Sequence, residues 1–312
     1  MHTLRIVFMG TPEFAVASLD ALVGSNHEVV GVVTVADKPA GRGKQLQMSA
    51  VKEYALKHQL PVLQPLKLRD ESFLTALKKL EADLFVVVAF RMLPEAVWQM
   101  PPQGTINLHG SLLPQFRGAA PINHAIIQGE KETGVTTFFL QHEIDTGNII
   151  DQRRIPIRED ETAGELHDEM MHIGAQLLVE TVNNIAEGKT TSFPQEGVLR
   201  GMDEVKHAPK IFKEDCKIDW TLPLDRIYNL VRGLSPYPAA FTMLEGKTLK
   251  IFGGEKIHGA TLVLPGAFET DGKTYLKMAA GDGWYSITEL QLEGKKKMTT
   301  VEFLRGWRPN AS

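Results

Sequence analysis

An asparagine and a histidine two residues apart end one apolar run of the chain. Asn107 and His109 lie in the segment TINLHG, and alternate residues of a β-strand point to the same side of its sheet. Both side chains would therefore project together at the carboxyl end of a strand, where open α/β sheets place their sites. An amide and an imidazole there can stabilise an oxyanion and carry a proton. The alternative interpretation is a strand end held by ordinary hydrogen bonds.

A carboxylate follows the next strand candidate. Asp145 begins the sequence DTG, shortly after the apolar run at residues 135–140. If the two strands are neighbours, Asp145 reaches His109, orients the imidazole and stabilises its positive charge. The competing interpretation is an Asx-turn at Asp145. The two interpretations are compatible, because a turn can also aim a side chain.

Other chemistries lack their sequence patterns. Ser111 is not part of a Gly-x-Ser-x-Gly elbow, and the chain has no Walker loop. The first apolar run ends in a single Gly10, which is not a dinucleotide fingerprint. The ten histidines show no His-x-x-x-His pair with a third ligand, so we expect no metal.

The single cysteine, Cys216, excludes an intramolecular disulfide, and no apolar run reaches the ~20 residues that cross a membrane. We therefore expect a cytoplasmic protein without a membrane partner. The acidic neighbours of Cys216 would raise its pKa, so we interpret this thiol as a bystander. The net charge is −4, yet residues 208–312 carry 15 Lys and Arg against 12 Asp and Glu. This mild basic excess hints at an anionic partner, and chance variation is the alternative.

The elements that must position these side chains alternate along the first part of the chain. We expect strands at residues 4–9, 28–36, 83–90, 105–109 and 135–140. Ser49, Asp70 and the capping box that begins at Thr162 should each open a helix, the last running toward Gly188. This alternation predicts an α/β fold, with a Rossmann-like doubly wound sheet.

The pattern changes in the last third of the chain. One helix is expected at residues 222–234, followed by short strands separated by glycine-containing turns, which is typical of a small β-barrel. The periodicity fades before that change. We therefore predict a first domain at residues 1–189, a linker at 190–207 and a second domain at 208–312.

At this point the chain resembles a known family. NLHGSLLP at 107–114, followed by FRGAAP at 116–121, is similar to the signature of 10-formyltetrahydrofolate-dependent formyltransferases, and DTG at 145–147 is similar to their second motif. Four further stretches narrow the resemblance to the members that formylate methionyl-tRNA: GTPEF at 10–14, DKPAGRGK at 37–44, IDW at 218–220 and LSPYP at 234–238. The resemblance extends over nearly the whole chain.

The resemblance implies a Rossmann-like catalytic domain, 10-formyltetrahydrofolate as co-substrate, and a C-terminal OB-like β-barrel that helps to bind initiator methionyl-tRNA. It implies catalytic roles for Asn107, His109 and Asp145. It implies folate contacts from two segments, Ser111, Leu112, Leu113 and Pro114 in one and Arg91, Met92 and Leu93 in the other. The second segment departs from the family pattern YGLILP, because FRMLP at 90–94 is one residue shorter and lacks the glycine. Core packing is the alternative interpretation for Met92 and Leu93.

Arg42 and Lys44 stand between glycines in a basic loop. Glycines let a chain approach a phosphate backbone closely, so with the resemblance we interpret this loop as a tRNA contact. The alternative is a solvated surface turn. For the reaction itself, we expect the neutral amine to attack the formyl carbon directly while His109 and Asn107 donate hydrogen bonds to the developing oxyanion.

Three rival functions remain at this stage. The acceptor could be an amino sugar or a purine-pathway amine. The domain could instead hydrolyse the same folate to release formate. The chain could also be an inactive tRNA-binding protein, although the joint presence of Asn107, His109 and Asp145 argues against that. The sequence does not indicate an oligomeric state.

Overall fold

The computed structural model describes residues 2–40, 45–199 and 204–308. They form two compact units. The first unit comprises Met1–Gly118, Thr133–Ile155 and His167–His207, and the second comprises Ala119–Glu132, Pro156–Leu166 and Ala208–Ser312. The stretch that we predicted as a linker, residues 190–207, therefore lies within the first unit.

The first unit is built on a seven-stranded sheet with the order β10-β9-β7-β6-β1-β2-β5. Five of its strands are parallel: β1 (Arg5–Gly10), β2 (Glu28–Val33), β5 (Val62–Leu63), β6 (Leu84–Val88) and β7 (Thr105–His109). Strand β9 (Glu132–Phe139) is antiparallel to β7, and β10 (Ile149–Pro156) is the edge strand beyond it. The doubly wound prediction is confirmed for the parallel part of the sheet. Strand β10 was not predicted.

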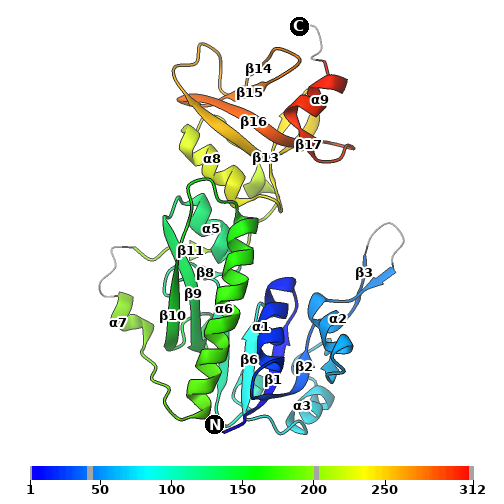
Figure 1. The fold of residues 1–312 in the computed structure, drawn as a ribbon, viewed down its shortest axis with the longest axis vertical. Coiled ribbons are helices and arrows are strands. Elements are labelled where there is room, and N and C mark those ends of the chain that lie inside the picture. Colours follow the sequence, from blue (N-terminus) through cyan, green and yellow to red (C-terminus); the bar gives the residue numbers. More distant parts are fainter. Residues whose placement is uncertain (1, 41–44, 200–203, 309–312) are drawn as a thin grey trace. The chain divides into compact units, whose positions relative to one another are not determined.

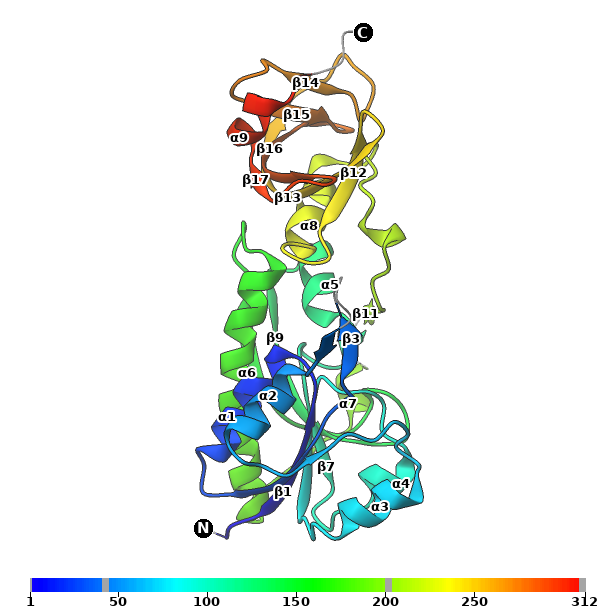
Figure 2. The same cartoon turned by 90° about the vertical axis from the view of Figure 1, so that its right-hand side faces the viewer.

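Both faces of this sheet are covered by helices, as Figure 2 shows. The helices of the unit are α1 (Glu13–Val23), α2 (Ala50–Lys57), α3 (Glu71–Lys78), α4 (Glu95–Trp98), α7 (Gln195–Leu199) and residues 167–186 of α6 (Ala163–Ala186). Val7 and Met9 of β1 pack with Phe73 and Leu77 of α3. Because strand residues alternate in direction, Ile6 and Phe8 face the other side, and all four are buried.

The three predicted helix starts are confirmed. The Ser49 side chain accepts a hydrogen bond from the Lys52 N–H at the start of α2. Thr162 and Glu165 form the reciprocal bonds of a capping box at the start of α6. Asp70 is the N-cap residue of α3, although its side chain makes no cap bond.

Four short strands in two pairs complete the description of this unit, β3 with β4 and β8 with β11. Strands β3 (Lys38–Ala40), labelled in Figure 1, and β4 (Gln45–Gln47) pair antiparallel. The two-residue strand β8 (Arg117–Gly118) follows the loop after β7, and β11 (His207–Ala208) lies where the first unit ends.

The second unit contains a curled antiparallel sheet with the order β12-β13-β16-β15-β14, and β17 pairs with β16. Its strands are β12 (Ala240–Leu244), β13 (Lys247–His258), β14 (Phe268–Thr270), β15 (Leu276–Ala279), β16 (Gly283–Leu292) and β17 (Met298–Thr299). Its helical elements are α5 (Pro121–Ile127), the 3₁₀ turn η1 (Glu214–Cys216), α8 (Leu224–Gly233) and α9 (Thr300–Gly306). The predicted OB-like barrel and the predicted helix near residues 222–234 are confirmed.

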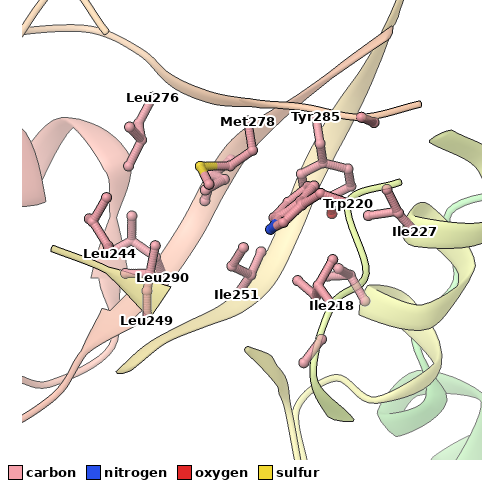
Figure 3. Close-up of a cluster of buried hydrophobic side chains, with 14 of the residues drawn as sticks. Ile218, Trp220, Ile227, Leu244, Leu249, Ile251, Leu276, Met278, Tyr285 and Leu290 are labelled. Atoms are coloured by element: carbon pink, nitrogen blue, oxygen red, sulfur yellow. The ribbon is translucent and has the colours of Figure 1, made fainter. Parts of the chain in front are cut away.

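The core of the second unit lies inside this curled sheet (Figure 3). The Tyr285 ring lies so close to β13 that a Cβ on Gly254 would come within 2.2 Å of it, so only glycine fits there. The buried Trp220 indole N–H donates to Thr242 Oγ1 at 2.9 Å. Losing such a partner for a buried N–H costs about 1–3 kcal/mol. This bond therefore fixes Trp220 within the core.

Candidate active site

His109 ends β7 and is 7% exposed. Its Nε2 lies 3.0 Å from the Phe116 carbonyl oxygen, so this nitrogen carries the proton and donates. Its Nδ1 lies 3.9 Å from Asp145 Oδ2, which is longer than a hydrogen bond. Both ring nitrogens thus face acceptor oxygens.

Asn107 shares a sheet face with His109. The intervening Leu108 points toward α6, because a Cβ on Gly174 of that helix would lie 2.9 Å from Leu108 Cδ2. Asn107 and His109 therefore point to the opposite face. The Asn107 side chain is half-buried, and no described residue hydrogen-bonds to it. Its amide is free to donate to a substrate oxygen beside the imidazole.

Asp145 reaches His109 by a route that the sequence did not indicate. We expected it at the end of a neighbouring strand beside His109. Strand β9 is antiparallel to β7, so its last residue, Phe139, pairs with Ile106, and His109 pairs with Thr136. The loop after Phe139 carries Asp145 to His109 instead. Within the first unit, the Oδ2 atom of Asp145 accepts a hydrogen bond from the Gly118 N–H at 3.0 Å.

The DTG loop passes close to the end of β9. A Cβ on Gly147 would lie 1.6 Å from the Phe139 carbonyl oxygen, so no other residue fits without moving the loop. Asp145 has a positive φ of 55°, a conformation that aspartate tolerates better than most residues. The Asp145 carboxylate thus faces His109 from a turn, but it accepts from Gly118, and no bond within the described residues makes this turn the Asx-turn that the sequence suggested.

Gln195, which the sequence interpretation missed, binds this loop from α7. Its Nε2 donates to the Asp145 and Gly147 carbonyls at 2.9 and 2.8 Å. Its Oε1 accepts from Arg117 Nε at 3.1 Å and Nη2 at 2.6 Å. The fading periodicity of residues 190–207 gave no indication of a buried side chain there. Arg117 was noticed only as part of a motif.

The four residues of the first predicted folate segment continue directly from β7. Ser111 is buried and its Oγ donates to the Gln115 carbonyl at 2.6 Å. The Leu113 N–H donates to Thr136 Oγ1, and the Leu113 side chain packs against Phe138. Leu112 is half-buried and Pro114 is buried. The segment is thus fixed beside His109 by backbone and side-chain bonds.

The second predicted folate segment follows β6. The Arg91 guanidinium donates to the carbonyls of Pro65 and Leu66, and its buried Nε has no protein partner. Leu93 belongs to the same core as Val97 of α4, whereas Met92 is 73% exposed. Core packing therefore describes Leu93 and does not describe Met92.

Sequence comparison decides the family. Residues 4–182 match the profile described as "Formyl transferase", and residues 210–308 match "Formyl transferase, C-terminal domain". The chain belongs to the formyl transferase family.

This formyl transferase is similar over most of its length to several curated proteins. It is 56% identical over 309 residues to the methionyl-tRNA formyltransferase of Bacteroides fragilis, covering 97% of this chain and 95% of the relative. It is 51% identical over 310 residues to the methionyl-tRNA formyltransferase of Flavobacterium johnsoniae, covering 98% and 97%.

Solved structures share the fold of this formyl transferase. WlaRD, a sugar 3N-formyl transferase in the presence of dTDP and 5-N-formyl-THF, has a TM-score of 0.66 at 20% identity, covering 95% of this chain and 100% of that one. HypX from Aquifex aeolicus in complex with tetrahydrofolic acid has a TM-score of 0.65 at 19% identity. That comparison covers 98% of this chain and 48% of HypX.

The predicted tRNA contacts of this formyl transferase, Arg42 and Lys44, lie far from His109 in the sequence. Arg42 and Lys44 fall between β3 and β4, outside the described residues. Nearby, the Lys52 ammonium donates to Asp37 at 2.5 Å, and Gln64 also donates to that carboxylate. These bonds, the one from Lys52 first, hold the pKa of Asp37 below its ordinary value. The residue just before β3 is thereby anchored to helix α2.

Three features bear on other site types. Among the described residues, no cluster of three or more His, Cys, Asp or Glu side chains could hold a metal ion. No helix within the described ranges has the length and apolar composition to cross a membrane. Cys216 is 2% exposed, and burial, more than the neighbouring Asp215, raises its pKa. We had attributed that shift to the acidic neighbours alone.

Proposed function

We propose that this protein transfers the formyl group of 10-formyltetrahydrofolate to the α-amino group of initiator methionyl-tRNA, for translation initiation in the cytoplasm. The identity of 56% over nearly the full length of a methionyl-tRNA formyltransferase carries this proposal. The grouping of an amide, an imidazole and a carboxylate beside β7 supports it chemically, because acyl transfer requires donors at the developing oxyanion.

Bound 10-formyltetrahydrofolate supplies the formyl group to be transferred. The site suits a carbonyl substrate, since the Asn107 amide lacks a partner among the described residues and His109 Nε2 already holds a carbonyl oxygen. In the reaction, Asn107 donates to the formyl oxygen. His109 donates to the same oxygen after the substrate displaces the Phe116 carbonyl. Two donors at this oxygen stabilise the charge that develops on it.

The acceptor needs no protein nucleophile. An α-amine has a pKa of about 7.7–8.0, so a substantial neutral fraction is present at neutral pH and can attack directly. Asp145 keeps the imidazole of His109 oriented and stabilises its positive charge. In the proposed reaction its carboxylate takes the proton that the amine loses and returns it to the leaving nitrogen, through water where needed.

Two segments are proposed to hold the folate. The first comprises Ser111, Leu112, Leu113 and Pro114 next to His109, whose hydrogen-bonded conformation preorganises these contacts. Arg91, Met92 and Leu93 contribute backbone contacts to the pterin. The exposed Met92 side chain offers an apolar surface to it, while Leu93 keeps the segment in place from the core.

The tRNA is bound by positive charge and by the second domain. Arg42 and Lys44 are proposed to contact the phosphates of the acceptor end, with their flanking glycines allowing close approach. Residues 208–312 form a tRNA-binding domain, with residues 1–189 as the catalytic domain and 190–207 leading to the second. The excess of Lys and Arg over Asp and Glu in residues 208–312 suits an anionic partner.

One experiment tests the function directly. The natural chain is incubated with formyl-labelled 10-formyltetrahydrofolate and methionyl-tRNA, and the label is followed into tRNA or into formate. Label on methionyl-tRNA supports the proposal. Label in formate identifies a hydrolase. Absence of turnover with tRNA, followed by transfer to an amino sugar or a purine-pathway amine, assigns a different acceptor.

A further inference from the structure

Gln195 is buried without belonging to any catalytic motif. It is the first residue of α7 and is 0% exposed. An uncharged side chain with four hydrogen-bonding positions is costly to bury unless those positions are filled. Here all four are filled by groups around the candidate site: two N–H groups of Arg117 and the carbonyls of Asp145 and Gly147.

The partners determine which way the Gln195 amide faces. Arginine can only donate and carbonyl oxygens can only accept, so Oε1 must face Arg117 and Nε2 must face the DTG loop. A side chain of the same size without the amide N–H groups would lose both bonds to the loop. Glutamine is therefore chemically specific at this position and is not a space filler.

The helix that carries Gln195 is itself tied to the sheet. The backbone of Phe193, two residues earlier, exchanges hydrogen bonds with Ile149 of β10 at 2.9 and 3.0 Å. The loop that Gln195 binds has exposed side chains at residues 141–144 just before Asp145. The anchor is thus fixed by the sheet, while the loop that carries the carboxylate projects toward solvent.

We propose that Gln195 is a positioning residue for formyl transfer, which holds Asp145 against His109 by binding the backbone on either side of the Asp-Thr-Gly turn. This inference rests on the proposed function. Gln195 touches no reacting atom in this role. It acts through Asp145, whose carboxylate must stay near His109 Nδ1 for the imidazole to keep its orientation.

The main test variant is Gln195→Glu. It keeps the size of the side chain and an oxygen for Arg117, and it replaces the two donors to the loop by an oxygen that repels carbonyls. The adjacent guanidinium favours the ionised form, so the variant keeps a partner in the fold. Gln195→Ala, which removes all four bonds, serves as a second variant if Gln195→Glu does not fold.

The matched control is Thr181→Val. Thr181 on α6 is equally buried and hydrogen-bonds Thr137 of β9 and the Leu177 carbonyl, each at 2.9 Å, and none of its bonds within the described residues reaches the loop or α7. This variant removes these two buried hydrogen bonds while keeping the shape of the side chain. It should lower the melting temperature and leave kcat and the exchange of loop amides as in the natural chain.

Two measurements are made on all variants: steady-state kinetics with both substrates, and hydrogen exchange of residues 140–148. In Gln195→Glu we expect kcat to fall by about 10- to 100-fold, because a small misplacement of a reacting group has effects of that size. The KM for each substrate should change little. The loop amides should exchange faster. In an Asp145→Asn background, Gln195→Glu should lower kcat much less, because both changes act on one carboxylate.

The outcomes separate this inference from the proposed function. Natural kcat with natural loop protection in Gln195→Glu overturns the positioning role, as does a full, additive loss of kcat in the Asp145→Asn background. If the natural chain leaves methionyl-tRNA unformylated, the proposed function fails. The exchange data then still decide the positioning role, which lost protection in the loop supports and unchanged protection overturns.

Discussion

The Asp145 carboxylate accepts a hydrogen bond from the backbone N–H of Gly118 at 3.0 Å. This bond joins the DTG loop to the chain that leaves the folate segment, so two motifs far apart in the sequence meet at one carboxylate. The same Oδ2 atom faces His109 Nδ1. Substitutions of Asp145 and His109 can therefore distinguish the role of the carboxylate in orienting the imidazole from the role of its negative charge.

His109→Ala should lower kcat for methionyl-tRNA formylation by about 10²–10³-fold, because it removes one oxyanion donor. The chain should still fold, as measured by circular dichroism and thermal unfolding. His58→Ala is the control, since the exposed His58 directly follows helix α2 and its ring stacks on Tyr54, away from β7. A folded His109→Ala protein with natural kcat would exclude His109 from the mechanism.

Asp145→Asn should lower kcat by about 10²-fold, because it removes the charge beside His109. The variant keeps an oxygen that can accept from the Gly118 N–H, so the Gly118 amide should stay protected in hydrogen exchange. Asp145→Ala removes both and should also lose that protection. Equal activity of the natural chain and Asp145→Asn would show that the charge has no role.

Arg42→Ala and Lys44→Ala should each raise the KM for methionyl-tRNA and leave folate binding intact. Loss of one phosphate contact should make the salt dependence of tRNA binding shallower, by roughly one unit of log–log slope at most. Both substrates are titrated at several salt concentrations. Weak folate binding with normal use of tRNA would reassign the loop to the folate site.

Cys216 should react slowly with a thiol reagent at pH 8 in the native protein and fully after denaturation. Burial raises its pKa, so little thiolate is present in the folded state, and its Sγ donates to the Phe212 carbonyl. The thiol group is the only one in the chain, which makes the signal unambiguous. Fast native reaction that also abolishes turnover would contradict the bystander interpretation.

The local patterns of the sequence predicted most of the fold. The run at 105–109 gave β7, and the Thr162 capping box gave the start of α6, because both depend on residues near in the chain. The direction of β9 could not be predicted, since an apolar run reads the same in a parallel or an antiparallel strand. Asp70 precedes α3 as predicted but makes no side-chain cap bond, because residue type alone does not fix a side chain's orientation.

The sequence motifs predicted which residues belong to the candidate site, but they did not predict the contacts between those residues and the rest of the chain. Asn107, His109 and Asp145 belong to recognisable stretches, whereas Gln195 lies in a segment whose periodicity fades. Its role arises from bonds to Arg117 and to two carbonyls far away in sequence. The hydrogen bond from His109 to the Phe116 carbonyl could not be predicted either, because every residue type has a backbone carbonyl.

Gly147, the third residue of the DTG motif, has a steric role. A side chain there would collide with the Phe139 carbonyl, because the loop passes directly over the end of β9, the strand that precedes it. The Asp145 carboxylate is the reactive group of the motif, and Gly147 lets the backbone pass close to β9. An alanine at that position would force the loop away from β9, and the Asp145 carboxylate, two residues earlier, would be displaced from the imidazole with it.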